Sequence, residues 1–167
     1  MYKLLIADDE QWIRQGLREI INWGSCNIHE VWEAADGEDA LYKVREFKPD
    51  IVIADIRMPE IDGLELSAIL REEFPQTKVI IISGYKDFDY ARKAVELGVS
   101  NYILKPIDEN SIIETVKRCI KEIDREREML REQEIMKRQI KKNIFLLKQE
   151  FILSIFEEGV YAAAKCQ

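Results

Sequence analysis

The chain has 167 residues, 47% of them hydrophobic and 34% charged, and its formal net charge at pH 7 is −7. This length fits one domain, or one domain with an extension, and the composition fits a folded core beneath a charged surface. No run of about 18 apolar residues is present, so we expect no membrane-spanning helix. The N-terminal apolar stretch is too short for a signal peptide, and we therefore expect a cytoplasmic protein.

The charge is unevenly distributed along the chain. Residues 1–110 contain 13 Lys and Arg against 22 Asp and Glu, whereas residues 111–167 contain 12 against 10. Nothing forms the basic patch that nucleic-acid binding requires, and the acidic first part would repel phosphate backbones unless it held a cation. The three cysteines, Cys26, Cys119 and Cys166, show neither metal-site spacing nor a disulfide framework, so we expect free thiols.

Five short apolar runs predict buried strands at residues 3–7, 28–35, 51–54, 78–82 and 101–104. Apolar residues at helical spacing separate these runs. They are Ile13, Leu17, Ile20 and Ile21; Ala40, Leu41, Val44 and Phe47; Leu64, Ala68, Ile69 and Leu70; and Phe88, Ala91, Ala94, Val95 and Leu97. A fifth helix is expected to begin near Asp108. Such alternation predicts an α/β fold with a parallel sheet covered by helices on both faces.

Polar residues stand where four of the predicted strands end. Asp8 and Asp9 follow the first strand, Asp55 the third, Ser83 the fourth and Lys105 the fifth. Because the carboxyl ends of parallel strands share one edge of the sheet, we expect these side chains to lie close together. Taken singly, Asp55 could instead cap the following loop or helix, and Asp8 or Asp9 could cap the first helix.

The combination of these residue types predicts a particular chemistry. Crowded carboxylates raise one another's pKa unless a cation lies between them, and oxygen ligands without His or Cys suit Mg²⁺ rather than Zn²⁺. Lys105 offers a positive charge to a phosphoryl oxygen, Ser83 offers a hydroxyl donor, and Gly84 permits close approach of the backbone. Phosphoryl transfer onto Asp55, with its carboxylate as nucleophile, needs this set of groups.

Four motifs carry a resemblance to a known family: Ile6-Ala-Asp8-Asp9-Glu10, Asp55-Ile-Arg-Met58-Pro59 with Asp62-Gly63, Ser83-Gly84, and Tyr102-Ile-Leu-Lys105-Pro106. On these motifs, residues 1–120 resemble the receiver domain of bacterial two-component response regulators. The segment Ser83-Gly84-Tyr85-Lys-Asp87-Phe88-Asp-Tyr90-Ala91 resembles the subgroup whose output domain is an AraC-type DNA-binding module. The resemblance implies a flavodoxin-like, doubly wound sheet of five parallel strands in the order 2-1-3-4-5.

The resemblance also implies which residues bind the phosphoryl group and the metal. Asp55 would be the phosphoacceptor, taking a phosphoryl group from a sensor histidine kinase. Asp9 would bind Mg²⁺ directly and Asp8 largely through water, with Asp55 and the backbone carbonyl of Arg57 completing the protein's ligands. Lys105 would contact the phosphoryl group.

Further roles implied by the resemblance concern the response to phosphorylation. The Lys105–Pro106 bond would be cis, a geometry that proline permits. Ser83, which replaces the threonine common in the family but keeps its hydroxyl, would follow the phosphate inward, and Tyr102 would rotate into the space behind it. Such a protein is a signalling phosphoacceptor and not an enzyme, since at most it catalyses its own phosphorylation and dephosphorylation.

The last third of the chain has a different pattern. From Ser111 it contains no proline and no glycine until Gly159, and its apolar residues fall mostly three or four apart. This predicts a long helix that continues the fifth helix, with an imperfect coiled-coil seam over residues 111–156. The alternatives are a frayed single helix and a helix that packs back on its own domain. We expect a homodimer through this coiled coil, through the face of the fourth helix, fifth strand and fifth helix, or through both.

The end of the chain bears on whether we expect a DNA-binding output domain. Residues 157–167 look unlike the start of a domain, and their last part could be a vector remnant. We therefore expect a DNA-binding output domain to be absent, and the chain not to bind DNA by itself. Two other functions stay open: a scaffold that dimerises without phosphorylation, and a phosphatase of the haloacid dehalogenase type. The latter carries a second aspartate two residues after its nucleophile, where this chain has Arg57.

Overall fold

The computed structural model describes residues 1–84, 88–99 and 101–164. Residues 85–87, which belong to the motif that resembles the AraC-type subgroup, lie outside the described residues. So do residues 165–167, and with them the prediction for Cys166 and for the end of the tail. The described chain divides into two compact units, which meet at the bond between Ile123 and Asp124.

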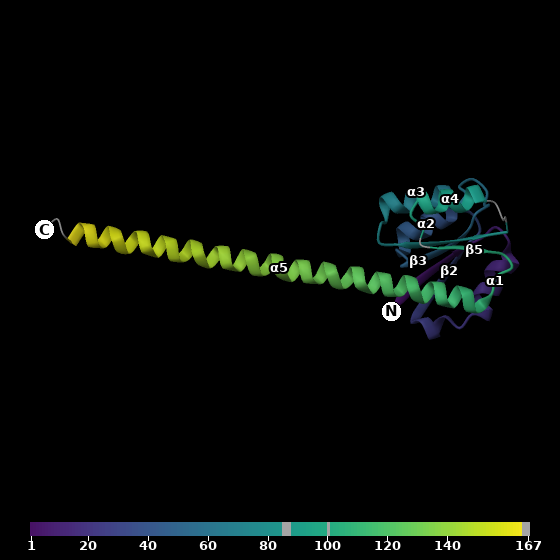
Figure 1. The fold of residues 1–167 in the computed structure, drawn as a ribbon, viewed down its shortest axis with the longest axis horizontal. Coiled ribbons are helices and arrows are strands. Elements are labelled where there is room, and N and C mark those ends of the chain that lie inside the picture. The colour runs from purple at the N-terminus through teal and green to yellow at the C-terminus, as the bar shows by residue number, and fades with distance from the viewer. Residues whose placement is uncertain (85–87, 100, 165–167) are drawn as a thin grey trace. The chain divides into compact units, whose positions relative to one another are not determined.

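The first unit is an α/β domain in which strands and helices alternate (Figure 1). Its strands are β1 (Tyr2–Ala7), β2 (Ile28–Ala34), β3 (Ile51–Asp55), β4 (Lys78–Ser83) and β5 (Asn101–Leu104). Its helices are α1 (Gln11–Ile20), α2 (Gly37–Phe47), α3 (Gly63–Glu73), α4 (Phe88–Glu96) and the first part of α5 (Glu109–Ala164), and a 3-10 turn, η1 (Trp23–Cys26), follows α1. The strands pair in parallel in the order β2-β1-β3-β4-β5. The predicted fold, strand order and long C-terminal helix are therefore confirmed.

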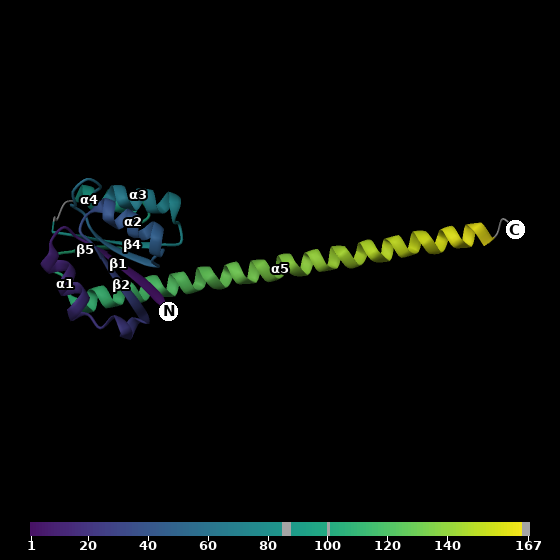
Figure 2. The same ribbon diagram turned by 180° about the vertical axis from the view of Figure 1, so that it is seen from behind.

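Helices cover both faces of the sheet, and successive strand residues face opposite sides (Figures 1 and 2). Leu4 and Ile6 of β1 pack with residues of α1 and of the beginning of α5. Leu5 and Ala7 pack on the other side, with residues of α2, α3 and α4. Because the central strands are buried on both faces, they appear in the sequence as continuous apolar runs, the pattern typical of parallel sheets.

Side-chain caps fix where two of the helices begin. α2 follows Asp36, whose carboxylate accepts a hydrogen bond from the amide of Asp39. α3 follows Asp62, which forms a reciprocal capping box with Glu65. α1 begins after Glu10 without a side-chain cap, so neither aspartate of the Asp8-Asp9 pair has the capping role that was one alternative for them. These two acids are therefore available for other interactions.

Several positions predicted on apolar helix faces are exposed. Ile20 and Val95 are 70% and 74% exposed, and Ala68 is exposed as well. Ile21 has left the helix in an extended conformation and is buried, so α1 ends one residue earlier than its apolar pattern indicates. The reason is geometric: the apolar stripe on these helices is wider than the strip that contacts the sheet.

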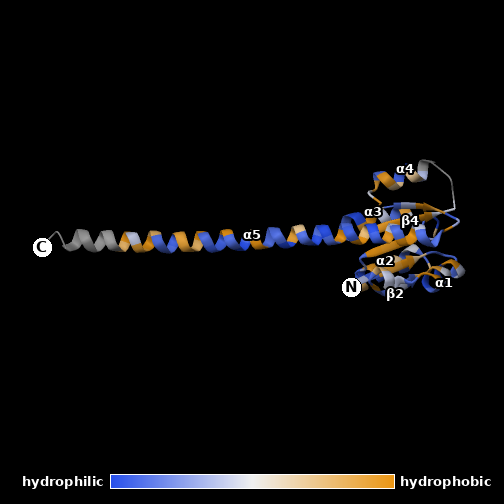
Figure 3. Ribbon diagram, turned by 60° about the horizontal axis from the view of Figure 1, so that its bottom comes forward, coloured by the Kyte–Doolittle hydropathy of each residue, from blue (hydrophilic) through white to orange (hydrophobic). Residues whose placement is uncertain are grey.

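The second unit consists of α5 from Asp124 onward. Its large apolar side chains between Met129 and Phe156 are each 46–68% exposed. Hydrophobic and hydrophilic residues are interspersed along this part of the helix (Figure 3). Across the described residues, no helix combines the length and the apolar character that crossing a membrane requires.

Candidate functional site

Asp55 is the last residue of β3, and both oxygens of its carboxylate are engaged. Oδ1 lies 2.7 Å from Nζ of Lys105, and Oδ2 accepts a 2.9 Å hydrogen bond from the backbone amide of Arg57. The chain leaves β1 toward β2 on one side and β3 toward β4 on the other, although β1 and β3 are neighbours. Asp55 thus lies at the topological switch point of the sheet, where open α/β sheets bind their ligands.

The loop after Asp55 is held at both ends. The amide of Gly63 donates a 3.0 Å hydrogen bond to the carbonyl oxygen of Ile56. A Cβ atom at Gly63 would collide with the carbonyl oxygen of Asp55, so only glycine fits this close approach. The neighbouring Asp62 caps α3. Residues 56–62 therefore form a fixed loop beside the carboxylate of Asp55.

Three further carboxylates gather at the end of β1. Ligand oxygens of Asp8, Asp9 and Glu10 all lie within 4.8 Å of one another. Asp8 is buried, and its Oδ1 accepts a 2.8 Å hydrogen bond from the amide of Glu10, whereas Asp9 and Glu10 are exposed. This places one anchored and two accessible carboxylates at the edge of the sheet that also carries Asp55.

Lys105 connects the strand ends. Its Nζ lies 2.7 Å from Oδ1 of Asp55, 3.3 Å from Oδ2 of Asp8 and 3.8 Å from Oε1 of Glu10. Its amide donates a 2.7 Å hydrogen bond to the carbonyl oxygen of Ser83, and its bond to Pro106 is cis, as expected. The ammonium group therefore lies among the carboxylates as their internal counter-charge.

These charges shift one another's protonation. Burial raises the pKa of Asp8 above its ordinary value, and the nearby Asp55 raises it further; the Glu10 amide and Lys105 act in the opposite direction without cancelling the rise. Burial tends to lower the pKa of Lys105, but its hydrogen bond to Asp55 and the charges of Asp55 and Asp8 outweigh burial and raise it. Ionised Asp8 is therefore only partly compensated, which is the condition under which a bound cation is favourable.

The predicted switch residues lie at the same end of the sheet or close to it. Ser83 is fully buried, ends β4 and pairs with Leu104, so it lies beside the residue that precedes Lys105. Tyr102 pairs with Ile81 and is half-buried against the core on the side of α2, α3 and α4. The structure thus brings Asp8, Asp9, Asp55, Ser83 and Lys105 to one edge, and Tyr102 lies two residues before Leu104 on the short strand β5.

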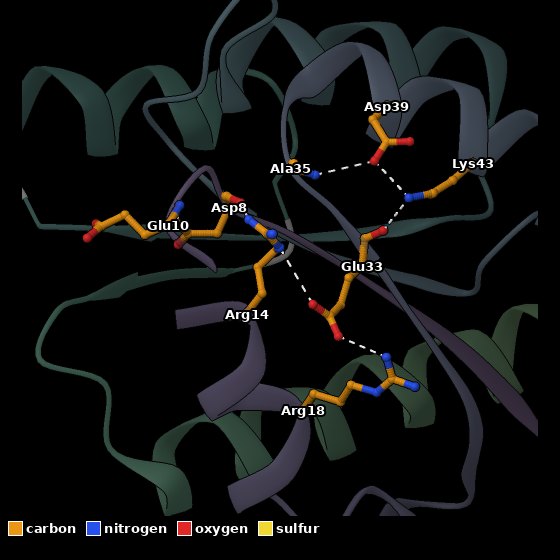
Figure 4. Close-up of polar contacts among 8 residues, drawn as sticks. All are labelled: Asp8, Glu10, Arg14, Arg18, Glu33, Ala35, Asp39 and Lys43. Atoms are coloured by element: carbon orange, nitrogen blue, oxygen red, sulfur yellow. Dashed lines mark hydrogen bonds and ion pairs between the residues drawn. The ribbon is translucent and has the colours of Figure 1, made fainter. Parts of the chain in front are cut away.

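Sequence reasoning missed two contributors to the site. Glu10 was noted only as part of a motif, yet it belongs to the carboxylate group and reaches toward Lys105. Arg14 was not singled out, yet its Nη1 donates a 2.6 Å hydrogen bond to the carbonyl oxygen of Asp8 (Figure 4). The only signal in the sequence is spacing, since Arg14 stands one helical turn after Glu10.

The donor set fits Mg²⁺ by its chemistry. Asp8, Asp9, Glu10 and Asp55 offer hard carboxylate oxygens, which Mg²⁺ prefers in a shell completed by water and phosphate oxygens. Two of these residues, Asp9 and Glu10, are exposed and leave room for water. The arrangement is an acidic pocket with one embedded lysine, suited to a divalent cation and a phosphoryl group together.

Comparison with known proteins agrees with this geometry. The model of the response regulator receiver domain matches residues 4–117. The uncharacterized transcriptional regulatory protein YesN of Bacillus subtilis is 40% identical over 126 residues, which cover 75% of this chain and 34% of YesN. The transcriptional regulatory protein HptR of Staphylococcus aureus is 40% identical over 108 residues, which cover 65% of this chain and 42% of HptR. The chain therefore spans less than half the length of these curated relatives.

Solved structures give the same result. The receiver (REC) domain of AraT, a response regulator from Geobacillus stearothermophilus, is 41% identical with a TM-score of 0.70, covering 75% of this chain and 98% of that domain. A two-component transcriptional regulator AraC from Clostridium phytofermentans is 32% identical with a TM-score of 0.70, covering 75% of this chain and 97% of that structure. The predicted resemblance is confirmed: this chain belongs to the response regulator receiver domain family.

Proposed function

We propose that residues 1–120 are a phosphoacceptor module that receives a phosphoryl group on Asp55 from a sensor histidine kinase. The observation that supports this most strongly is the position of the Asp55 carboxylate, at the switch edge of the sheet with Nζ of Lys105 2.7 Å away. The carboxylates of Asp8 and Asp9 beside it supply the acidic pocket that receiver domains use for Mg²⁺.

The residues suggest how the transfer would proceed. A carboxylate oxygen of Asp55 attacks phosphorus, and the new P–O bond forms as the P–N bond to the donor histidine breaks; the nitrogen keeps the electron pair. Lys105 neutralises charge on the phosphoryl oxygens, and the amide of Arg57 holds the second oxygen of Asp55. When bound by Asp8, Asp9, Asp55 and the carbonyl of Arg57, Mg²⁺ adds further positive charge at the phosphoryl group.

Ser83 and Tyr102 are proposed to convert the new charge into a conformational change. Ser83 is joined to Lys105 by a backbone hydrogen bond, so both are positioned to respond to an anion on Asp55. Tyr102 is only half-buried and lies two positions from Leu104, which pairs with Ser83. A local electrostatic event of this kind biases a two-state element, here the face of α4, β5 and α5.

A groove beside the site supports a docking surface for the kinase. It has a volume of about 400 Å³ and lies between α1 and the segment after β5, with Trp12, Gly16, Ile20, Pro106 and Ile107 among its lining residues. Trp12 and Ile20 are 71% and 70% exposed. Lys105 also lines the groove, so a partner seated there would hold its phosphohistidine close to Asp55.

The exposed part of α5 supports homodimerisation. Its apolar residues, with Gln133 at the start, recur in steps of 3, 4, 4, 3, 4 and 4: Gln133, Met136, Ile140, Ile144, Leu147, Phe151 and Ile155. The six apolar members, which we call the α5 seam, are each 48–66% exposed. An 11-residue period of this kind favours a straight or right-handed pairing of helices over the left-handed supercoil of a heptad repeat. We therefore propose that the exposed part of the predicted 111–156 linker, residues 124–156, pairs with a second copy, whereas Ile112 and Val116 are buried in the first unit.

The direct test is phosphorylation in vitro. Incubation with acetyl phosphate and MgCl₂ should add one phosphoryl group, and reductive trapping with borohydride should locate it at Asp55. The Asp55→Asn variant should show no modification. The matched control is Asp50→Asn, since Asp50 lies just before the amino end of the same strand, where its carboxylate accepts a hydrogen bond from the amide of Lys3. Labelling that persists in Asp55→Asn would overturn the assignment.

A second candidate function is favoured by the exposure of the α5 seam: a scaffold that associates whether or not it is phosphorylated. Sedimentation with and without beryllofluoride separates the two, because a phosphorylation switch predicts tighter association with the mimic. One solved receiver domain, that of DrrB, is described as BeF3-activated, which makes the mimic a practical probe. We further propose that the output is transcriptional control through a DNA-binding domain outside these residues. The phosphatase alternative has no support, since Arg57 occupies the position of its second aspartate.

A further inference from the structure

We propose that Arg14 is a positioning residue that orients the peptide between Asp8 and Asp9 for cation binding. This inference rests on the proposed Mg²⁺ site, but it concerns a residue that neither the motifs nor the predicted ligand set include. Arg14 belongs to α1, and only 13% of its side chain is exposed. Its guanidinium group lies between Asp8 and Glu33 (Figure 4).

The contact between Arg14 and Asp8 is to the backbone. Nη1 of Arg14 lies 2.6 Å from the carbonyl oxygen of Asp8. Asp8 is the last residue paired to β2, because its amide donates a 3.1 Å hydrogen bond to the carbonyl oxygen of Ala34. Beyond this point the carbonyl of Asp8 no longer faces a strand partner, and Arg14 supplies a charged donor in its place.

This hydrogen bond completes the fixation of Asp8. The amide is held by Ala34, the carbonyl by Arg14 and Oδ1 by the amide of Glu10, so Oδ2 is left facing Lys105. The carbonyl of Asp8 belongs to the same planar peptide unit as the amide of Asp9. Fixing that carbonyl therefore sets the direction in which the chain enters Asp9, the exposed carboxylate proposed to bind the cation directly.

Arg14 is itself held by an ion pair with Glu33 of β2. Its Nε lies 3.6 Å from Oε2 of Glu33, and the other carboxylate oxygen of Glu33 accepts a 2.8 Å hydrogen bond from Arg18 (Figure 4). The carbonyl oxygen of Glu33 accepts a 2.6 Å hydrogen bond from Lys43, which also pairs with Asp39 at 2.7 Å. Outer partners of this kind orient metal ligands, and their loss commonly weakens metal affinity by about 10- to 100-fold.

The chain offers a matched control, Arg18→Gln, and an intermediate variant, Glu33→Gln, for this proposal. Arg18 contacts Glu33 but is not among the partners of Asp8, so Arg18→Gln loosens α1 from β2 and spares the Asp8 carbonyl. Glu33→Gln removes the charge that both arginines share. Arg14→Gln removes the hydrogen bond to Asp8, and Arg14→Lys keeps the positive charge on a shorter donor.

The experiment measures the affinity of the folded protein for MgCl₂ by tryptophan fluorescence, with Mn²⁺ binding followed by electron paramagnetic resonance as a second readout. We expect Arg14→Gln to weaken binding about tenfold, Arg14→Lys and Glu33→Gln to weaken it less, and the control Arg18→Gln to stay within about twofold of the wild type. Thermal unfolding confirms that each variant is folded. If Arg14→Gln does not fold, Arg14→Lys decides, and an affinity no weaker than that of Arg18→Gln counts against the proposal.

Two results would overturn the inference. Equal losses in Arg14→Gln, Arg18→Gln and Glu33→Gln would show that Arg14 acts only by fastening α1 to β2. Unchanged affinity in both Arg14 variants would show that the Asp8 carbonyl needs no such donor. In either case the wild type still binds Mg²⁺, so the proposed function survives; a wild type that binds neither ion would refute the cation site as well.

Discussion

Two stretches of one helix differ in how they are covered. In α5, Ile112, Val116 and Cys119 are fully buried and Ile123 is 3% exposed, because they pack against the sheet. Later in the same helix, residues such as Ile140 and Ile144 are 50% and 48% exposed. The residue types are similar, so an apolar stripe on a helix indicates that something covers it but not what. In the first stretch the domain's own sheet covers the stripe, and in the second we propose that another copy does.

The largest expected effect sharpens this comparison with one substitution at two places. Ile112→Ala should lower the free energy of unfolding of the first unit by about 2–5 kcal/mol, because it leaves a cavity in a closed core. Ile144→Ala should change it by less than about 0.5 kcal/mol. All three tryptophans lie within the first 32 residues, so urea unfolding followed by tryptophan fluorescence reports on this unit. Similar losses of unfolding free energy at both positions would show that the two stretches of α5 do not differ in how they are packed.

The second prediction concerns association. Ile144→Glu puts a charge into the α5 seam and should weaken self-association about tenfold or more, measured by sedimentation over a range of concentrations. Lys142→Glu, an exposed change that helical periodicity places on the opposite side, is the matched control. A second group of exposed apolar residues includes Phe145 and Phe156. Association that survives Ile144→Glu would point to that group instead.

The third prediction tests the fixed loop beside Asp55. Gly63→Ala should destabilise the first unit by about 1–3 kcal/mol, because the added methyl group collides with the backbone of Asp55. Gly84→Ala is a control at the same end of the sheet, where the nearest atom to an added Cβ is Cδ of Lys105, at 3.9 Å. If both variants lose the same stability, the close approach at Gly63 is not what holds the loop.

The smallest effect is the pH dependence that Asp8 contributes. Its pKa is raised above the ordinary value of 3.8, so the stability it adds is fully present below that value and is lost as the pH rises through the folded pKa. At neutral pH without Mg²⁺, Asp8→Asn should therefore be more stable than the wild type by at most about 1 kcal/mol, since Lys105 and the amide of Glu10 offset part of the cost of burying the charge. Urea unfolding between pH 4 and 8 should show this difference shrinking toward acid pH. A difference that grows toward acid pH would contradict the assignment.

Much of the fold could be predicted because the signals were local. Buried strands read as apolar runs, and the residues that end them, such as Asp55 and Ser83, were placed at the right edge because parallel strands share a direction. Local patterns failed where tertiary contacts decide. Ile20 fits the apolar stripe of α1, but the chain turns away from the helix at Ile21 and leaves Ile20 outside.

The candidate site likewise combines residues that the sequence identifies with contacts that only the folded structure shows. The acids and Lys105 are recognisable by type and position. The contact of Arg14 with the Asp8 carbonyl depends instead on how α1 packs against β1 and β2. The residue types in the sequence do not predict this contact. The need for glycine at position 63 likewise follows from a backbone contact with Asp55 that only the folded chain shows.

The anchored loop of residues 56–62 has a consequence for binding. Its conformational entropy is lost when the chain folds, because Gly63 is bonded to Ile56 and Asp62 caps the following helix. The amide of Arg57 is then already pointing at Asp55 when a ligand arrives. A ligand that binds at this edge therefore finds the loop already ordered, so its binding free energy is not reduced by the entropic cost of ordering residues 56–62.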